Sequence, residues 1–151
     1  MDRFRYRFRS VWDLDAPPGS VLAVLARPAD YPRWWPQVRE VTLLGEDRGT
    51  VRVRSLLPYE LNLGVRAVRS DLAAGVLEIT MYGDLDGRAR WTVTAHGRGS
   101  RAVYEQEVEV RRPLLRRLTG PARPLLRANH ALMMRSGRRG LTAYLRTGHR
   151  I

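Results

Sequence analysis

His130 comes nearest, by residue type and position, to supporting acid–base chemistry in this chain. An unperturbed imidazole titrates near pH ~6.5, so a histidine that faces a bound molecule can act as a general acid or base. Helical spacing places His130 beside Leu126, Met134 and Leu141, at the edge of an apolar stripe. The sequence shows no partner that would orient it, so a structural role on the helix flank competes with catalysis.

Asn129 is the second polar residue of interest on the same helical pattern. A period of 3.6 residues puts it on the apolar stripe between Leu125 and Met133, facing a sheet. A buried amide needs hydrogen-bond partners, which would be either a strand backbone or turn, or the carbonyl or hydroxyl of a ligand. Of the two adjacent methionines, we expect Met133 rather than Met134 to face the sheet.

The sequence gives weaker support for a metal site or a paired-carboxylate site than for a role of His130 or Asn129. The chain has no cysteine, and neither His96 nor His149 has a second ligand at metal-binding spacing, so we expect no metal and no cofactor. Asp84 and Asp86 flank an apolar residue and could form a paired-carboxylate site. Aspartate next to glycine is also typical of a hairpin turn, and that interpretation is the simpler one.

Aromatic residues are spread through the chain in a way that favours a pocket. Each alone is as well explained as core filling. Together they would give flat apolar walls with polar tips, suited to a planar or polycyclic ligand. The set is Trp34, Trp35, Tyr59, Tyr82, Trp91, Tyr104 and Tyr144.

The elements that must position these residues begin with strands. Residues 4–14 alternate between apolar and charged, which predicts a half-buried strand, and prolines after it predict two short helices. Residues 38–111 predict six further strands with one solvated face, so the sheet is antiparallel. The expected inward-facing residues are Val51, Val53, Ser55, Leu57, Leu61, Leu63, Val65, Ala67, Leu77, Ile79, Met81, Ala89, Trp91, Val93, Ala95, Ala102, Tyr104, Gln106, Val108 and Val110.

A helical period follows the strands. We expect a short helical piece after Pro113 and a main helix from Pro121 or Pro124 to about Arg146. Gly137 and Gly140 on its inner side predict close approach to a strand or a tryptophan. The resulting fold class is α+β, a curved seven-stranded antiparallel sheet wrapped around a long C-terminal helix, in one domain spanning residues 1–151. Because one helix cannot cover so wide a sheet, a pocket should remain between them.

Composition sets the remaining limits. The sequence has 44% hydrophobic and 28% charged residues, with no signal-like start or membrane-length apolar run, so we expect a folded cytoplasmic protein. All 27 basic residues are arginines, and the formal charge is +12. Their dispersal favours a solvated surface over a single anionic partner. A basic helix face (Arg116, Arg123, Arg127 and Arg138) would at most associate weakly with an anionic membrane surface, and no nucleic-acid motif accompanies it.

Four groups of residues, in this order along the whole chain, resemble the START-like helix-grip superfamily (SRPBCC), in its polyketide cyclase/dehydrase and lipid-transport branch. They are Asp30–Pro36, Pro58–Leu61, Gly83–Gly87 followed by Trp91, and Asn129–Met134 leading to Gly137, Gly140 and Leu141. The resemblance implies a helix-grip fold with an enclosed cavity, and its members include ligand carriers, cyclases, dehydratases and stress proteins without chemistry.

The sequence therefore predicts a protein that binds an apolar or aromatic small molecule, lipid-like or polyketide-like, as a monomer or homodimer. The alternative is a polyketide cyclase or dehydratase, a lyase-type enzyme that would use His130 for aldol cyclisation or water loss. The expected cavity residues are Trp35, Tyr59, Leu63, Met81, Trp91, Tyr104, Asn129 and Met133.

Overall fold

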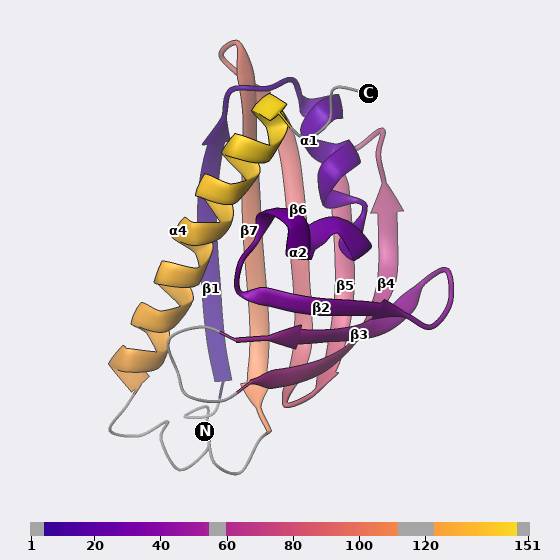
Figure 1. Ribbon diagram of the computed structural model, residues 1–151, viewed down its shortest axis with the longest axis vertical. Coiled ribbons are helices and arrows are strands. Elements are labelled where there is room, and N and C mark those ends of the chain that lie inside the picture. Colours follow the sequence, from indigo (N-terminus) through magenta and orange to yellow (C-terminus); the bar gives the residue numbers. More distant parts are fainter. Residues whose placement is uncertain (1–4, 55–59, 112–122, 148–151) are drawn as a thin grey trace.

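The computed structural model describes residues 5–54, 60–111 and 123–147 (Figure 1). A long strand is followed by short helices, six more strands and a long helix. The strands are β1 (Arg5–Leu14), β2 (Val38–Leu43), β3 (Arg48–Val53), β4 (Leu61–Asp71), β5 (Val76–Gly83), β6 (Leu85–His96) and β7 (Gly99–Val110). The helices are α1 (Pro18–Leu25), the 3₁₀ turn η1 (Pro28–Asp30), α2 (Tyr31–Trp34) and α4 (Arg123–Thr147).

All seven strands form one antiparallel sheet, in the order β1-β7-β6-β5-β4-β3-β2. Strands β2 and β3 run across the long strands in Figure 1, so the sheet curves around the space in front of it. Helix α4 lies over the β1–β7 side of this concave face. The predicted α+β helix-grip architecture, with two short helices after the first strand, is confirmed.

Cross-strand charge pairs hold the first strand to the last. Because β1 and β7 alternate in step, arginines of one strand stand opposite glutamates of the other on the outer face. Opposite charges directly across an antiparallel pair contribute roughly 0.2–1 kcal/mol each. The registered pairs are Arg5 with Glu109, Arg7 with Glu107, and Arg9 with Glu105.

The pairing of β5 with β6 ends at Met81 and Gly87, so the connection between them spans Tyr82 to Asp86 and overlaps the glycine–aspartate segment that the sequence predicts as a turn. The Asp84 carboxylate accepts a hydrogen bond from the backbone N–H of Asn62 at 2.8 Å. The Asp86 carboxylate accepts one from Arg111 Nε at 2.9 Å. Both aspartates therefore have structural partners at this turn, as the hairpin interpretation expects.

Four tryptophans fill the half of the concavity under the C-terminal part of α4. Trp12, Trp34, Trp35 and Trp91 are all buried and in ring contact, with Trp12 centroids 4.8–6.4 Å from the other three. Trp35, directly after α2, also donates a hydrogen bond from Nε1 to the Met133 carbonyl of α4 at 2.9 Å.

Helix α4 can lie this close because glycines face the tryptophans. A Cβ atom on Gly137 would be 2.6 Å from Trp35 Cε2, and one on Gly140 would collide with the Trp34 carbonyl oxygen. The tryptophan alternative of the sequence prediction is therefore confirmed for both glycines.

The rotation of α4 differs from the prediction at two positions. Leu125, expected on the inner stripe, is 57% exposed, and Met134 is buried in the tryptophan core although Met133 was expected to face the sheet. Met133 is only partly buried and lies at the cavity described below. The helix begins at Arg123 within the described residues, and the short helical piece predicted after Pro113 lies outside them.

Candidate ligand-binding cavity

A cavity of about 430 Å³ occupies the part of the concavity that the tryptophans leave open. The N-terminal half of α4 forms one wall, and the inward residues of β3 to β7 form the other. These strand residues are mainly the apolar series predicted from alternation, among them Leu63, Val65, Ile79 and Met81. The helix is thus too narrow to fill the space that the sheet encloses.

Most residues predicted for the cavity lie on its surface. Trp35, Leu63, Met81, Trp91, Tyr104, Asn129 and Met133 all line it. Tyr59 lies outside the described residues. His130, expected at the edge of the helix–sheet interface, lies in the cavity wall itself.

Three side chains form a polar cluster in this apolar wall. The Tyr104 hydroxyl donates to Gln106 Oε1 at 2.5 Å, and His130 Nε2 lies 3.4 Å from the same oxygen. Because an amide oxygen can only accept, His130 carries its proton on Nε2, and Nδ1 is then the acceptor. The Gln106 amide N–H groups remain to donate to a bound molecule.

Burial sets the protonation state of this cluster. Desolvation lowers the pKa of His130 to about 4, so the imidazole is neutral at pH 7. Its ring stacks on Phe8, with centroids 3.7 Å apart and planes 9° from parallel. Desolvation also raises the pKa of Tyr104, which keeps its hydroxyl protonated. The cluster therefore presents neutral donors and acceptors and no charge.

Gln106 and Tyr31 were not predicted as site residues. Gln106 is the one amide in the inward series of β7, between Tyr104 and Val108, and that interruption was the available signal. Tyr31 lines the cavity beside Trp35, and its hydroxyl donates to the Leu25 carbonyl at 2.7 Å. Burial raises the pKa of Tyr31 as well.

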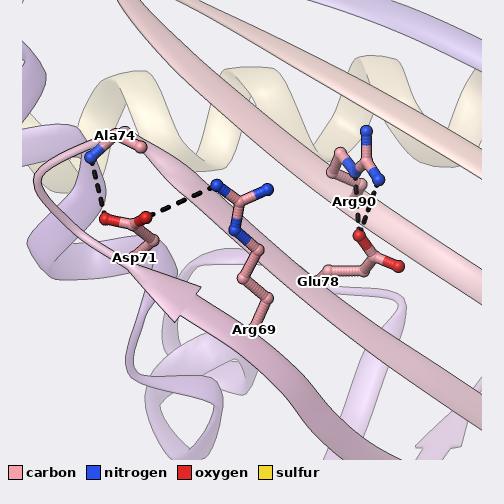
Figure 2. A network of polar contacts seen from close by, with 5 residues as sticks. All are labelled: Arg69, Asp71, Ala74, Glu78 and Arg90. Atoms are coloured by element: carbon pink, nitrogen blue, oxygen red, sulfur yellow. Dashed lines mark hydrogen bonds and ion pairs between the residues drawn. The ribbon is translucent and has the colours of Figure 1, made fainter.

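The cavity opens where its lining residues are exposed, between η1, the β2–β3 turn and the end of β4. Exposed lining residues there are Pro28, Leu43, Asp47, Arg48, Ala67 and Arg69. Figure 2 shows how two charged groups of this rim are held. The Asp71 carboxylate accepts hydrogen bonds from Arg69 at 3.4 Å and from the Ala74 backbone N–H at 3.0 Å. These contacts lower the pKa of Asp71.

Glu78, on the same rim, accepts two hydrogen bonds from Arg90 on the neighbouring strand, one from Nε at 2.9 Å and one from Nη2 at 2.8 Å (Figure 2). Arg69 and Glu78 are thus neutralised locally at the rim. In the described ranges no group of three metal-ligating side chains comes together. No helix of these ranges combines the length and apolarity that a membrane crossing requires.

Comparison with known protein families agrees with this architecture. The model of the family described as "Polyketide cyclase / dehydrase and lipid transport" matches residues 5–146. The chain belongs to this family. The resemblance predicted from the sequence is therefore confirmed. No curated protein sequence matches the chain.

Solved structures of this fold are similar at low sequence identity. TTHA0849 from Thermus thermophilus has a TM-score of 0.80 and 15% identity, covering 95% of this chain and 99% of that one. The Zhui aromatase/cyclase from Streptomyces sp. R1128 has a TM-score of 0.78 and 16% identity, with 94% of each chain covered. A START superfamily protein from Mycobacterium smegmatis has a TM-score of 0.75 and 10% identity, covering 93% and 97%. At these identities the similarity shows the fold.

Proposed function

We propose that this member of the family binds an apolar, flat or polycyclic small molecule in the cavity between the sheet and α4. The observation that supports this is a cavity of about 430 Å³ with apolar walls and one uncharged polar cluster. That volume lies within the range of roughly 300–1,000 Å³ typical of small-molecule sites. The family description, which includes lipid transport, agrees with such a cargo.

The walls supply affinity and the polar cluster supplies orientation. Apolar ligand area removed from water contributes about 25 cal/mol per Å² before the costs of association are subtracted. Aromatic faces of Trp91 and Tyr104, whose centroids are 4.8 Å apart, favour a planar ligand. A ligand carbonyl would accept from the Gln106 amide, and a ligand hydroxyl would donate to His130 Nδ1.

The test is to fill the cavity from β4. Leu63→Trp and Val65→Trp place an indole in the cavity, while Val68→Trp adds the same ring to an exposed position of the same strand. We expect the two cavity variants to lose at least tenfold in affinity for the apolar fluorophore N-phenyl-1-naphthylamine, and to lose molecules that co-purify with the wild type in native mass spectrometry. Equal binding by Leu63→Trp, Val65→Trp and Val68→Trp would refute a ligand in this cavity.

A second candidate is a cyclase or dehydratase, favoured by the position of His130 in the cavity wall. Neutral His130 can take a proton from a carbon next to a ketone, and the Gln106 amide can donate to the enolate oxygen that develops. Attack of that enolate on a second carbonyl forms the carbon–carbon bond and an alkoxide, to which the protonated His130 returns its proton. Removal of a neighbouring C–H proton and departure of this hydroxyl as water complete a dehydration. Structural neighbours described as aromatase/cyclases include Zhui and the di-domain ARO/CYC protein BexL.

The variant His130→Phe separates the two candidates, because it keeps the ring that stacks on Phe8 and removes both nitrogens. An enzyme would lose cyclised product and keep the ligand, whereas a carrier would show no turnover in either form. The expectations of one domain, a cytoplasmic location and a monomer or homodimer stay predictions.

A further inference from the structure

The positive charge of this chain is concentrated at its C-terminal end. Residues 1–110 hold 16 arginines and all 15 carboxylate side chains, whereas residues 111–151 hold 11 arginines and no aspartate or glutamate. Almost the whole net charge of +12 therefore belongs to the last segment. Dispersal of the arginines favours a solvated surface, whereas the absence of carboxylates from residues 111–151 makes this end of the chain strongly basic.

Several sheet arginines are balanced by acids. Arg7 lies 3.3 Å from Glu107, Arg101 lies 2.8 Å from Asp13, and Arg90 is held by Glu78. Such exposed pairs add little stability, but they cancel the charge of the sheet surface locally. Helix α4 contains six of the eleven arginines of residues 111–151 and no acidic residue that could balance them.

Helix α4 separates its residues cleanly by direction. Leu126, His130, Met133, Gly137 and Leu141 face the cavity or the tryptophans. At 100° per residue, the opposite side presents seven exposed residues within about one quarter of the helix circumference, two of which are the small residues Ala128 and Ala143. The five larger ones are called the outer stripe here: Leu125, Leu132, Arg135, Arg139 and Arg146.

The arginines of α4 fall into two groups. Arg123, Arg127 and Arg138 donate to main-chain carbonyls of β1, on Arg5, Arg7 and Asp13, at 2.8, 3.5 and 3.5 Å. They attach the helix to the edge strand. Arg135, Arg139 and Arg146 are exposed and have no ion-pair or hydrogen-bond partner for their guanidinium groups within residues 5–54, 60–111 and 123–147.

We propose that the outer stripe of α4 docks on an anionic phospholipid bilayer. Leu125 and Leu132, 57% and 46% exposed, would enter the headgroup–acyl boundary, and the three arginines would meet lipid phosphates. Exposed leucines next to arginines, without any acid, supply both contributions to interfacial binding, which are burial of apolar area and attraction to anionic lipid.

Other occupants fit this face less well. A nucleic acid would use the arginines but leaves the exposed leucines without apolar contact. A second copy of the stripe would bring like charges together. The proposal is independent of what the cavity holds, although the same helix forms the cavity wall.

The experiment measures co-sedimentation with vesicles of phosphatidylcholine containing about one third phosphatidylglycerol. Each basic residue near such a surface contributes roughly a factor of five in partitioning. We therefore expect the triple variant Arg135→Gln, Arg139→Gln, Arg146→Gln to bind at least tenfold more weakly than the wild type. Leu125→Ser with Leu132→Ser should remove the binding that remains at about 0.5 M salt, where surface charges are screened.

A matched control removes the same charge elsewhere. Arg27→Gln, Arg54→Gln and Arg98→Gln alter three exposed arginines outside α4, and we expect less than a twofold loss. All variants should keep N-phenyl-1-naphthylamine binding, which shows that they are folded and separates this test from that of the cavity. Any one of three results would overturn the proposal. The control variant could lose as much vesicle binding as the α4 variant, or the wild type could fail to bind anionic vesicles at low salt. The third is that the wild type binds double-stranded DNA as tightly as vesicles at the same phosphate concentration.

Discussion

At the scale of single residues, the cavity changes what its histidine can do. His130 is surrounded by Phe8, Tyr104 and the Gln106 amide, none of which carries a charge at neutral pH. Desolvation therefore outweighs any stabilisation of the imidazolium and lowers the pKa to about 4. A neutral imidazole accepts a proton or a hydrogen bond, and it does not provide an acid at pH 7.

This burial makes stability depend on pH. Between about pH 6.5 and 4 the unfolded chain binds a proton at His130 that the folded chain does not, so the free energy of unfolding falls as the pH falls. When the pH is lowered from about 7.5 to 4.5, we expect the free energy of unfolding to fall by about 2–3 kcal/mol less in His130→Phe than in the wild type. Urea denaturation at both pH values measures this, and parallel losses in the two proteins would contradict the buried neutral histidine.

Most residues that the sequence predicts for the cavity line it, whereas the contacts between them were not predicted. Alternation along β7 identifies Tyr104 and Gln106 as inward-facing, because side chains of a strand point to opposite sides in turn. Whether His130 of α4 reaches Gln106 depends on how a distant helix is placed against that strand. No local pattern contains that information, so the sequence could place Gln106 on the inner face of β7 but could not show its contact with His130.

At the scale of elements, α4 is positioned by what its glycines allow. The strand pattern predicted the sheet well, since a period of two fixes the facing of residues except where the register shifts, as it does between Ala67 and Arg69. The facing of a helix is less certain because adjacent positions differ by only 100°. Contact of the tryptophans with Met134, Gly137 and Leu141 sets the rotation, and Leu125 consequently turns outward.

Alanine at the two helix glycines tests that packing. Helix propensity alone would favour each change by about 1 kcal/mol. We expect Gly137→Ala to destabilise by about 1–3 kcal/mol because its Cβ would crowd Trp35, and Gly140→Ala to cost more because its obstacle is the Trp34 backbone. Gly19→Ala in α1 is the control, since its Cβ would meet nothing within 4 Å.

Denaturation in urea should rank the four proteins. Gly19→Ala should equal or exceed the wild type, followed by Gly137→Ala and then Gly140→Ala. If both α4 variants were as stable as Gly19→Ala, close packing of the helix on the tryptophans would be wrong.

At the scale of the whole molecule, the concavity is divided into a solid half and a hollow half. One buried cluster contains the four tryptophans with α1, α2 and the C-terminal part of α4, and a second, smaller cluster includes Tyr6, Met81 and Val108 beside the cavity. The sequence indicated that one helix could not cover seven strands. It could not indicate which half would be filled, because that depends on four tryptophans from β1, α2, the residue after α2, and β6 meeting in space.

This division predicts unequal local stability across one continuous sheet. Strands β4 and β6 are both interior, so each has a hydrogen-bonded neighbour on both sides, yet β4 has Gly64 as its sole buried residue while Ala89, Trp91 and Val93 of β6 are buried. Because local opening is easier where less apolar surface is buried, amides of β4 should exchange with deuterium faster than those of β6. A guest in the cavity contacts Leu63 and Val65 of β4 as well as Trp91 of β6. Because the β6 amides are already the better protected, saturation with N-phenyl-1-naphthylamine should slow exchange in β4 by a larger factor than in β6. Mass-spectrometric exchange of peptides from the two strands measures both effects, and uniform protection with or without the fluorophore would mean that the two halves are equally well packed.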